Sequence, residues 1–251
     1  MIILLTNDDG WNAPGLSALR KALNGCGRII TVAPLHENSG VSQAITLRKP
    51  VRMWKTGTDC YKLDGTPTDC VFYTYLGAVD LDEPIGMVVS GINRGPNLGE
   101  DVIYSGTVAA AIEGTVHGIP SIAVSLHHQT SPGQYATAAK IARNAVIHVQ
   151  QHGLPKRTLL NINVPNSSYS ALKGIAVTTL GHRDYHDLLI KRTDPFGNPY
   201  FWLAGHEMDI NDSPHSDYHA LNNNRVSVTP ITLDMTAKRF QKSLQSWKWR
   251  L

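Results

Sequence analysis

The 251-residue sequence predicts an α/β fold: a Rossmann-like, doubly wound, mostly parallel sheet with an irregular C-terminal extension. Short continuous apolar runs recur along the first two-thirds of the chain, as is typical of strands buried on both faces of a parallel sheet. Segments of helical length separate these runs. From about residue 175, polar, aromatic and turn-forming residues replace the regular pattern.

The start of the chain predicts a β-α-β unit. Residues 2–6 form an apolar run typical of a buried strand, and residues 14–23 carry leucines at helical spacing, with Gly25 just past the end. Residues 28–33 form a second apolar run that Pro34 stops. This order predicts a right-handed crossover between two parallel strands.

The remaining elements follow from the same signals. Residues 42–64 alternate and are broken by Gly57, which suggests one or two additional strands or a hairpin. Thr66 and Pro67 are a good helix start, because a capping hydroxyl precedes a proline at the first helical position; this helix should reach about Ala78. We expect further strands over residues 86–90, 121–125, 158–164 and 225–229, and helices over 107–117, 134–151 and 234–247.

These elements predict one domain over residues 1–251. Its core should span about 1–175, and the segment of about 176–251 is poor material for an independent core. We find no internal repeat and no low-complexity tract.

Composition excludes several classes of protein. Hydrophobic residues make up 42% and charged residues 17%, which is typical of a globular protein, and a net charge of +3 does not predict a stable nucleic-acid complex. Three cysteines without a CxxC pair predict neither a disulfide framework nor a zinc knuckle. No segment is long enough to cross a membrane or resembles a signal peptide. We therefore expect a cytoplasmic protein without membrane contact.

Two adjacent acids, Asp8 and Asp9, follow the first predicted strand. Side by side, they would repel a phosphate unless a hard cation such as Mg²⁺ or Mn²⁺ lay between them and the anion. An isolated Asp-Asp-Gly is equally consistent with a helix cap or a turn ending at Gly10.

Two further loops carry polar residues at the ends of predicted strands. Ser39 and Gly40 close the loop after the second strand, where a hydroxyl is a plausible neutral ligand, although alone the pair reads as a turn. The glycine-rich loop of residues 90–99 carries Asn93 and Asn97, and it is not a Walker loop because no Gly-Lys-Ser/Thr follows.

This third loop leads to Ser105, Gly106 and Thr107 at the start of an alanine-rich helix. Free amides and the dipole at a helix N-terminus form a seat for phosphate. Because parallel sheets bind ligands at the carboxyl ends of their strands, all these loops should meet on one rim. The sequence thus predicts a metal beside a bound anion.

The ordered motifs also resemble the SurE family of survival-protein nucleotidases over nearly the whole chain. The matching segments are residues 7–10, 33–40, 64–71, 90–93, 104–108 and 226–230. The resemblance implies a metal-dependent nucleotidase acting on nucleoside 5′-monophosphates, and it leaves open activity on 3′-monophosphates and short polyphosphate.

The resemblance also assigns roles to residues. It implies one divalent cation, Mg²⁺ or Mn²⁺, per subunit, with Asp8 and Asp9 as catalytic residues and metal ligands. Ser39 and Asn93 complete the ligands, and the phosphate-binding residues are Gly40, Asn97, Ser105, Gly106 and Thr107. The family pattern has glycine where this chain has Ala109, and the extra methyl group should narrow the pocket slightly without affecting metal binding.

The family forms homodimers and homotetramers, often by exchanging C-terminal segments. This would account for the irregular stretch of the chain after residue 175.

Several alternatives compete with this interpretation. The His182/His186 and His215/His219 pairs and the adjacent His127 and His128 invite a zinc site, but we favour surface or interface histidines because helix geometry is doubtful there and no HExxH motif exists. Residues 247–250 interleave tryptophan with positive charge, as nucleic-acid and membrane contacts do, although packing at a subunit interface is a simpler reading.

Rival functions are a non-catalytic nucleotide-binding module that needs no metal, and a metal-dependent glycosyltransferase or deacetylase. The predicted phosphate seat weighs against the latter enzymes.

Overall fold

The computed structural model describes residues 1–127, 133–211 and 213–249. Nine strands form the main sheet, in the order β3-β4-β2-β1-β5-β6-β7-β11-β8. They are β1 (Ile2–Thr6), β2 (Arg28–Pro34), β3 (Met53–Gly57), β4 (Cys60–Leu63), β5 (Ile85–Arg94), β6 (Ser121–His127), β7 (Thr158–Pro165), β8 (Ile175–Val177) and β11 (Val226–Thr232).

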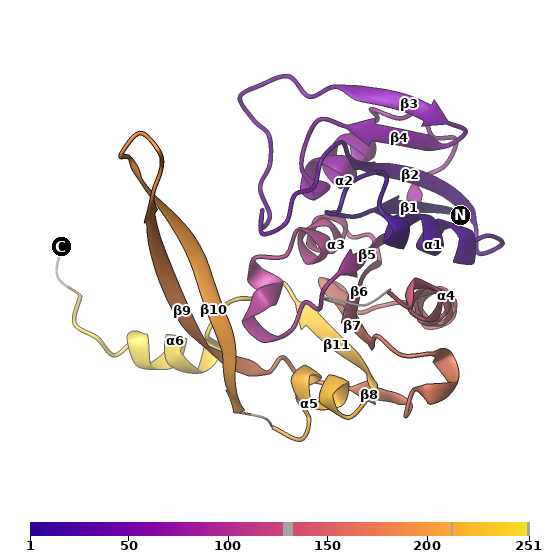
Figure 1. Ribbon diagram of the computed structural model, residues 1–251. Helices are drawn as coiled ribbons and strands as arrows, with labels where there is room; N and C mark the ends of the chain where they lie inside the picture. Colours follow the sequence, from indigo (N-terminus) through magenta and orange to yellow (C-terminus); the bar gives the residue numbers. More distant parts are fainter. Residues whose placement is uncertain (128–132, 212, 250–251) are drawn as a thin grey trace.

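Helices cover both faces of this sheet (Figure 1). They are α1 (Pro14–Ala22), α2 (Pro67–Tyr75), α3 (Gly106–Val116), α4 (Tyr135–His152), α5 (Asp217–Asn222) and α6 (Lys238–Leu244), with the short 3₁₀ helices η1 (Gly99–Ile103) and η2 (Tyr169–Ala171). A separate antiparallel pair consists of β9 (His182–Thr193) and β10 (Pro199–Asn211).

The centre of the sheet is parallel, which confirms the predicted fold class. β4, β2, β1, β5, β6 and β7 run in the same direction, while β3 and β11 pair antiparallel with β4 and β7. All five residues of β1 are buried, as its unbroken apolar sequence predicts. β3 and β4 form the additional hairpin expected within residues 42–64.

Two apolar clusters fill the space between the sheet and its helices. α1 and α4 pack on one face, and α2 and α3 on the other. α1 lies so close to β5 that a Cβ on Gly15 would stand 2.0 Å from the Ile92 carbonyl oxygen, so this position admits only glycine without a backbone shift.

The functional rim follows from the strand order. β1 lies between β2 and β5, and the chain leaves β1 for α1 on one face but leaves β5 for α3 on the other. The two connections diverge at this switch point and leave room between the carboxyl ends of β1 and β5, where doubly wound folds bind their ligands.

The C-terminal third is more regular than expected. β8 and β11 belong to the main sheet, and β11, which confirms the strand expected over residues 225–229, lies between β7 and β8. β9 and β10 form a long hairpin that extends away from the body (Figure 1). Described side chains of the hairpin such as Leu189, Trp202 and Leu203 are exposed, and an exposed strand does not need the apolar alternation that signals a half-buried one.

Helix boundaries differ modestly from those expected. α2 begins as predicted at Thr66 and Pro67, and the structure adds a capping box in which the Asp69 N–H donates to the Thr66 hydroxyl at 3.0 Å. The helix ends three residues before Ala78. The closing helix is α6 alone, shorter than the expected span of 234–247. None of the helices described has both the length and the apolar character that a membrane span requires.

Candidate metal and phosphate site

Asp8 lies two residues after the end of β1, buried against the first turn of α3. The Thr107 N–H donates to Asp8 Oδ2 at 3.1 Å, and the Thr107 hydroxyl donates to Oδ1. A Cβ on Gly106 would stand 2.8 Å from the Asp8 Cβ, so only glycine lets α3 approach this closely. The amino end of α3 therefore faces the Asp8 carboxylate, where the helix dipole stabilises negative charge.

The loop after β2 meets the same point. The Asn38 N–H donates to the Asp8 carbonyl oxygen at 2.8 Å, and the Asn38 carbonyl oxygen lies within 3.2 Å of the Cβ that Gly106 lacks. Next in the loop, the Ser39 hydroxyl donates to Glu37 Oε1 at 2.8 Å. Gly40 follows in a left-handed conformation, with φ of +69°.

The end of β5 supplies the third contact. The Arg94 N–H donates to Asp9 Oδ2 at 3.0 Å. The Asn93 Nδ2 donates to the Gly95 carbonyl oxygen at 2.8 Å. This contact orients the amide and leaves its Oδ1 without a hydrogen bond from the described residues. Asp8 thus contacts the loop that carries Ser39, and Asp9 contacts the end of β5, on which Asn93 lies.

Burial makes both carboxylates harder to ionise. Burial is the main cause that raises the pKa of Asp8, against the hydrogen bonds from Thr107. Burial, and next the neighbouring Asp8 charge, raise the pKa of Asp9 to about 6. The Glu37 carboxylate raises both further. A cation at this point would relieve a concentration of negative charge that the protein alone compensates poorly.

The donor atoms fit a hard divalent cation. Asp9 Oδ1, Asn93 Oδ1 and the Ser39 hydroxyl oxygen accept no hydrogen bond from any described residue, and each Asp8 oxygen retains a second lone pair. Within the described ranges, no three His, Cys, Asp or Glu side chains gather as a metal site. A metal here would therefore rest on two carboxylates and neutral oxygens, a donor set suited to Mg²⁺ or Mn²⁺.

The predicted phosphate seat is already partly used. Ser105 caps α3, accepting from the Val108 N–H at 3.1 Å, and the Thr107 amide donates to Asp8. The Gly106 amide has no such partner among the described contacts. At the N-terminus of α3, the Thr107 amide thus binds Asp8, and the Gly106 amide remains for an anion.

Asn97 occupies a different environment from the other predicted phosphate contacts. It is buried above β6 and β7, where its N–H donates to Asn163 Oδ1 at 2.8 Å and its Nδ2 donates to Ser125 Oγ at 2.7 Å. Its polar groups thus serve internal contacts.

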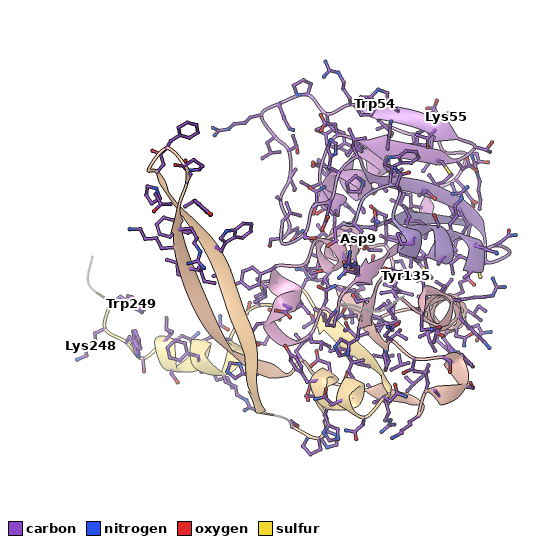
Figure 2. The ribbon with its side chains drawn as sticks, viewed as in Figure 1. Asp9, Trp54, Lys55, Tyr135, Lys248 and Trp249 are labelled. Carbon is purple, nitrogen blue, oxygen red and sulfur yellow. The ribbon has the colours of Figure 1, made fainter. Side chains whose placement is uncertain are left out.

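Sequence reasoning missed Glu37, Arg94 and Tyr135. Burial and the nearby Asp9 charge raise the pKa of Tyr135, which Figure 2 shows close to Asp9. Glu37 could have been found, because it precedes Ser39 in the same loop; Tyr135 starts α4, and no local pattern links it to Asp9.

The zinc alternative gains no support. His182 and His186 lie on the strand β9, so four residues place their Cα atoms about 13 Å apart. The His182 Nδ1 instead lies 2.5 Å from Glu100 Oε1. His128 and the His186 side chain lie outside the part of the chain that the structure describes.

The C-terminal segment of alternating tryptophans and basic residues lies apart from the candidate site. Trp247 and Trp249 are exposed, with ring centroids 5.7 Å apart, and Figure 2 shows Lys248 and Trp249 far from Asp9. Arg250 lies outside the described residues.

Comparison with known proteins gives a consistent picture. The family model described as "Survival protein SurE" matches residues 3–187. The chain is 44% identical over 243 residues to the "5'-nucleotidase SurE" of Aquifex aeolicus, covering 96% of both, and 44% identical over 247 residues to that of Pelobacter propionicus, covering 98% and 99%. The crystal structure of the SurE protein from Aquifex aeolicus superposes with a TM-score of 0.87 at 43% identity, covering 98% of each chain.

Proposed function

The chain belongs to the SurE family, and we propose that it is a metal-dependent phosphatase that hydrolyses nucleoside 5′-monophosphates. Relatives of nearly the same length carry the name 5′-nucleotidase. The observation that carries the proposal is the pair Asp8 and Asp9, two acids with raised pKa values beside a helix mouth at the switch point of the sheet. We include 3′-monophosphates and short polyphosphate as secondary substrates for testing.

We assign the metal ligands to Asp8, Asp9, Ser39 and Asn93, for one Mg²⁺ or Mn²⁺ per subunit. Thr107 holds both oxygens of Asp8 in place, and Gly95 holds the Asn93 amide. When bound, such an ion neutralises charge on a phosphoryl oxygen and lowers the pKa of a bound water.

The phosphate seat would lie at the first turn of α3. The free Gly106 amide and the helix dipole favour an anion there, with Ser105, Thr107 and Gly40 beside it. The contacts of Asn97 favour a supporting role for that residue over direct contact with phosphate.

Asp8 and Asp9 would then divide their work. Asp8, held through both oxygens, acts as a fixed ligand. Asp9 keeps Oδ1 free and is partly exposed, so it is the acid better placed to orient an attacking water and accept its proton.

Phosphate release from a panel of nucleoside monophosphates tests this function. We expect release with Mn²⁺ or Mg²⁺, none in EDTA, and a loss of at least 100-fold, on the order of one missing catalytic group, in the Asp9→Asn variant. A non-catalytic nucleotide-binding module predicts the opposite: tight nucleotide binding in EDTA and no release under any condition.

We also propose that the hairpin and the C-terminal segment mediate a homodimer or homotetramer, with exchange of C-terminal segments. These two segments expose more large apolar side chains to solvent than a monomeric protein usually does. They are Leu189, Phe196, Phe201, Trp202 and Leu203 on the hairpin, and Met235, Phe240, Trp247 and Trp249 beyond it.

We place the protein in the cytoplasm. All three cysteines are free, which suits a reducing compartment.

A further inference from the structure

A buried polar cluster holds the loop between β5 and η1. The backbone of Asn97 is fixed from both sides: its N–H donates to Asn163 Oδ1 at 2.8 Å, and its carbonyl oxygen accepts from Asn161 Nδ2 at 2.8 Å and Asn163 Nδ2 at 3.0 Å. The Asn97 side chain donates to Ser125 Oγ at 2.7 Å. Asn161, Asn163 and Ser125 are fully buried on β6 and β7.

This loop connects directly to a proposed metal ligand. The Gly95 N–H donates to the Leu126 carbonyl oxygen at 3.0 Å, and the Gly95 carbonyl oxygen accepts a hydrogen bond from the Asn93 Nδ2. At the other end of the loop, the Gly99 N–H donates to Asp217 Oδ2 at 2.9 Å. The orientation of the Asn93 amide therefore depends on a loop whose backbone is held at residues 95, 97 and 99.

From these contacts we propose that Asn163, together with Asn161 and Ser125, positions the metal site by fixing Asn97 and, through it, the Asn93 side-chain oxygen. The proposal rests on the proposed function, because it takes Asn93 as a ligand. None of the three residues on β6 and β7 need touch metal or substrate.

The burial of these groups supports a positioning role. Along β7 Asn161 and Asn163 alternate with apolar residues, while across the sheet Asn163 pairs with Ser125 and Ser227. Asn161 Oδ1 is buried and accepts no hydrogen bond from the described residues. Packing alone would be served better by aliphatic side chains at these positions. Residues that hydrogen-bond directly to a metal ligand typically change metal affinity by 10- to 100-fold when they are removed, and we expect residues that act through the loop to lie at the lower end of that range.

Titration of the full-length, metal-free protein with Mn²⁺ tests the proposal. Binding is measured by calorimetry or by the electron paramagnetic resonance signal of free Mn²⁺. We expect Asn163→Ala to weaken Mn²⁺ binding about tenfold. At saturating Mn²⁺ its rate of phosphate release should approach that of wild type. Thr178→Val is the matched control: Thr178 is also buried beside β11 and contacts Ser227 and Thr229, but it does not touch the loop, so its affinity should match wild type.

Two more variants make the outcome decisive. Should Asn163→Ala fail to fold, Ser125→Ala removes only the contact to the Asn97 side chain, and we expect a several-fold loss of affinity. Wild-type affinity in Asn163→Ala, or in Ser125→Ala where Asn163→Ala does not fold, overturns the proposal. Asn93→Ala distinguishes a failure of this proposal from a failure of the proposed function. If Asn93→Ala binds Mn²⁺ as wild type does, the proposed metal site itself is wrong.

Discussion

Asp8 and Asp9 are adjacent in the chain, yet the structure surrounds them differently. The first turn of α3 holds the Asp8 carboxylate through Thr107, whereas a single backbone amide, that of Arg94, holds Asp9. Glu37 lies near enough to raise the pKa of both acids. In the absence of a cation, burial of the adjacent Asp8 and Asp9 side chains therefore costs free energy when both are ionised.

Removal of the Asp9 charge should accordingly stabilise the metal-free protein. We expect the melting temperature of Asp9→Asn to exceed that of wild type in EDTA at pH 8, since both a buried charge and its repulsion from Asp8 are lost. Mn²⁺ at 100 times its Kd should stabilise wild type by about 2.7 kcal/mol and the variant by much less.

Differential scanning fluorimetry measures both effects. Asp80→Asn, at an exposed loop position, serves as the control and should respond to Mn²⁺ as wild type does. Equal stabilisation of wild type and Asp9→Asn by Mn²⁺ would argue against Asp9 as a ligand.

Individual residues were predictable only where a local pattern marks them. Asp8 and Asp9 stand out because two acids directly follow an apolar strand, and Ser105 because it precedes a helix. Asn161 and Asn163 could not be singled out, because their function depends on Asn97, a residue far away in sequence that only the folded sheet brings to them.

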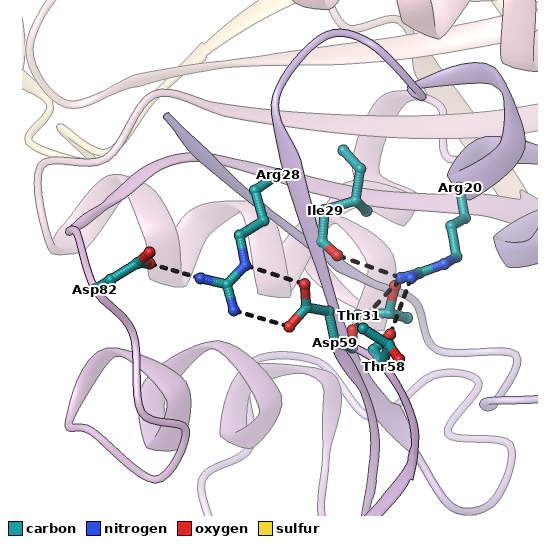
Figure 3. Close-up of polar contacts among 7 residues, drawn as sticks. All are labelled: Arg20, Arg28, Ile29, Thr31, Thr58, Asp59 and Asp82. Carbon is teal, nitrogen blue, oxygen red and sulfur yellow. Dashed lines mark hydrogen bonds and ion pairs between the residues drawn. The ribbon is translucent and has the colours of Figure 1, made fainter.

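Among the secondary-structure elements, the hairpin of β3 and β4 is held to the rest of the sheet by two arginines (Figure 3). Arg28 at the start of β2 forms two hydrogen bonds with Asp59, at 3.0 and 2.9 Å, and an ion pair with Asp82 at 2.6 Å. Arg20 of α1 reaches Thr31 Oγ1 at 2.5 Å and the carbonyl oxygen of Thr58 at 3.3 Å. These contacts hold the turn between β3 and β4 against β2.

This arrangement predicts a pH-dependent contribution to stability. The Arg28 guanidinium lowers the pKa of Asp59 below its usual value, so the pair stabilises the fold above about pH 4, the ordinary aspartate pKa. The contribution disappears as pH falls and Asp59 becomes protonated in the folded state.

Denaturant unfolding of Asp59→Asn at two pH values checks this. We expect a loss of at most about 1 kcal/mol at pH 7, because both side chains are partly exposed to solvent, and a smaller loss at pH 2.5. Asparagine tolerates the left-handed φ of +56° at this position, so the backbone is not a confounding factor. A loss of the same size at both pH values would contradict the electrostatic origin.

Elements that bury an apolar face were the predictable ones. β1, β2 and the helices α1 to α4 appear near their expected positions because burial imposes a period on the sequence. β9 and β10 were missed since they pair only with each other, and β8 was missed because its three residues are too few to show a period.

At the scale of the whole molecule, the structure divides into a layered body and an extended arm (Figure 1). The body supports the candidate site, while the arm, formed by β9 and β10, exposes large apolar side chains such as Phe201, Trp202 and Leu203. A two-stranded hairpin is marginally stable alone in water, so a second copy of the chain is the partner we expect to cover it.

Charged substitutions on the arm should therefore separate the subunits. We expect the double variant Trp202→Glu and Leu203→Glu to elute with the mass of one 27.5 kDa subunit, while wild type elutes as a dimer or tetramer. Light scattering coupled to size-exclusion chromatography gives the mass directly. Leu76→Glu, at an equally exposed site on the body, is the control and should leave the assembly intact.

A monomeric wild type, or a double variant that still assembles, would show that the arm is not the interface.

We propose above all that Asp8 and Asp9 share a divalent cation with Ser39 and Asn93 at the switch point of the sheet. Anomalous X-ray scattering from a crystal containing Mn²⁺ would locate that cation. We predict one peak per subunit, with oxygen atoms of all four side chains about 2 Å from it, as expected for a hard cation with oxygen ligands. A crystal whose only manganese peak lies elsewhere, with the two aspartates facing no common ion, would contradict the claim.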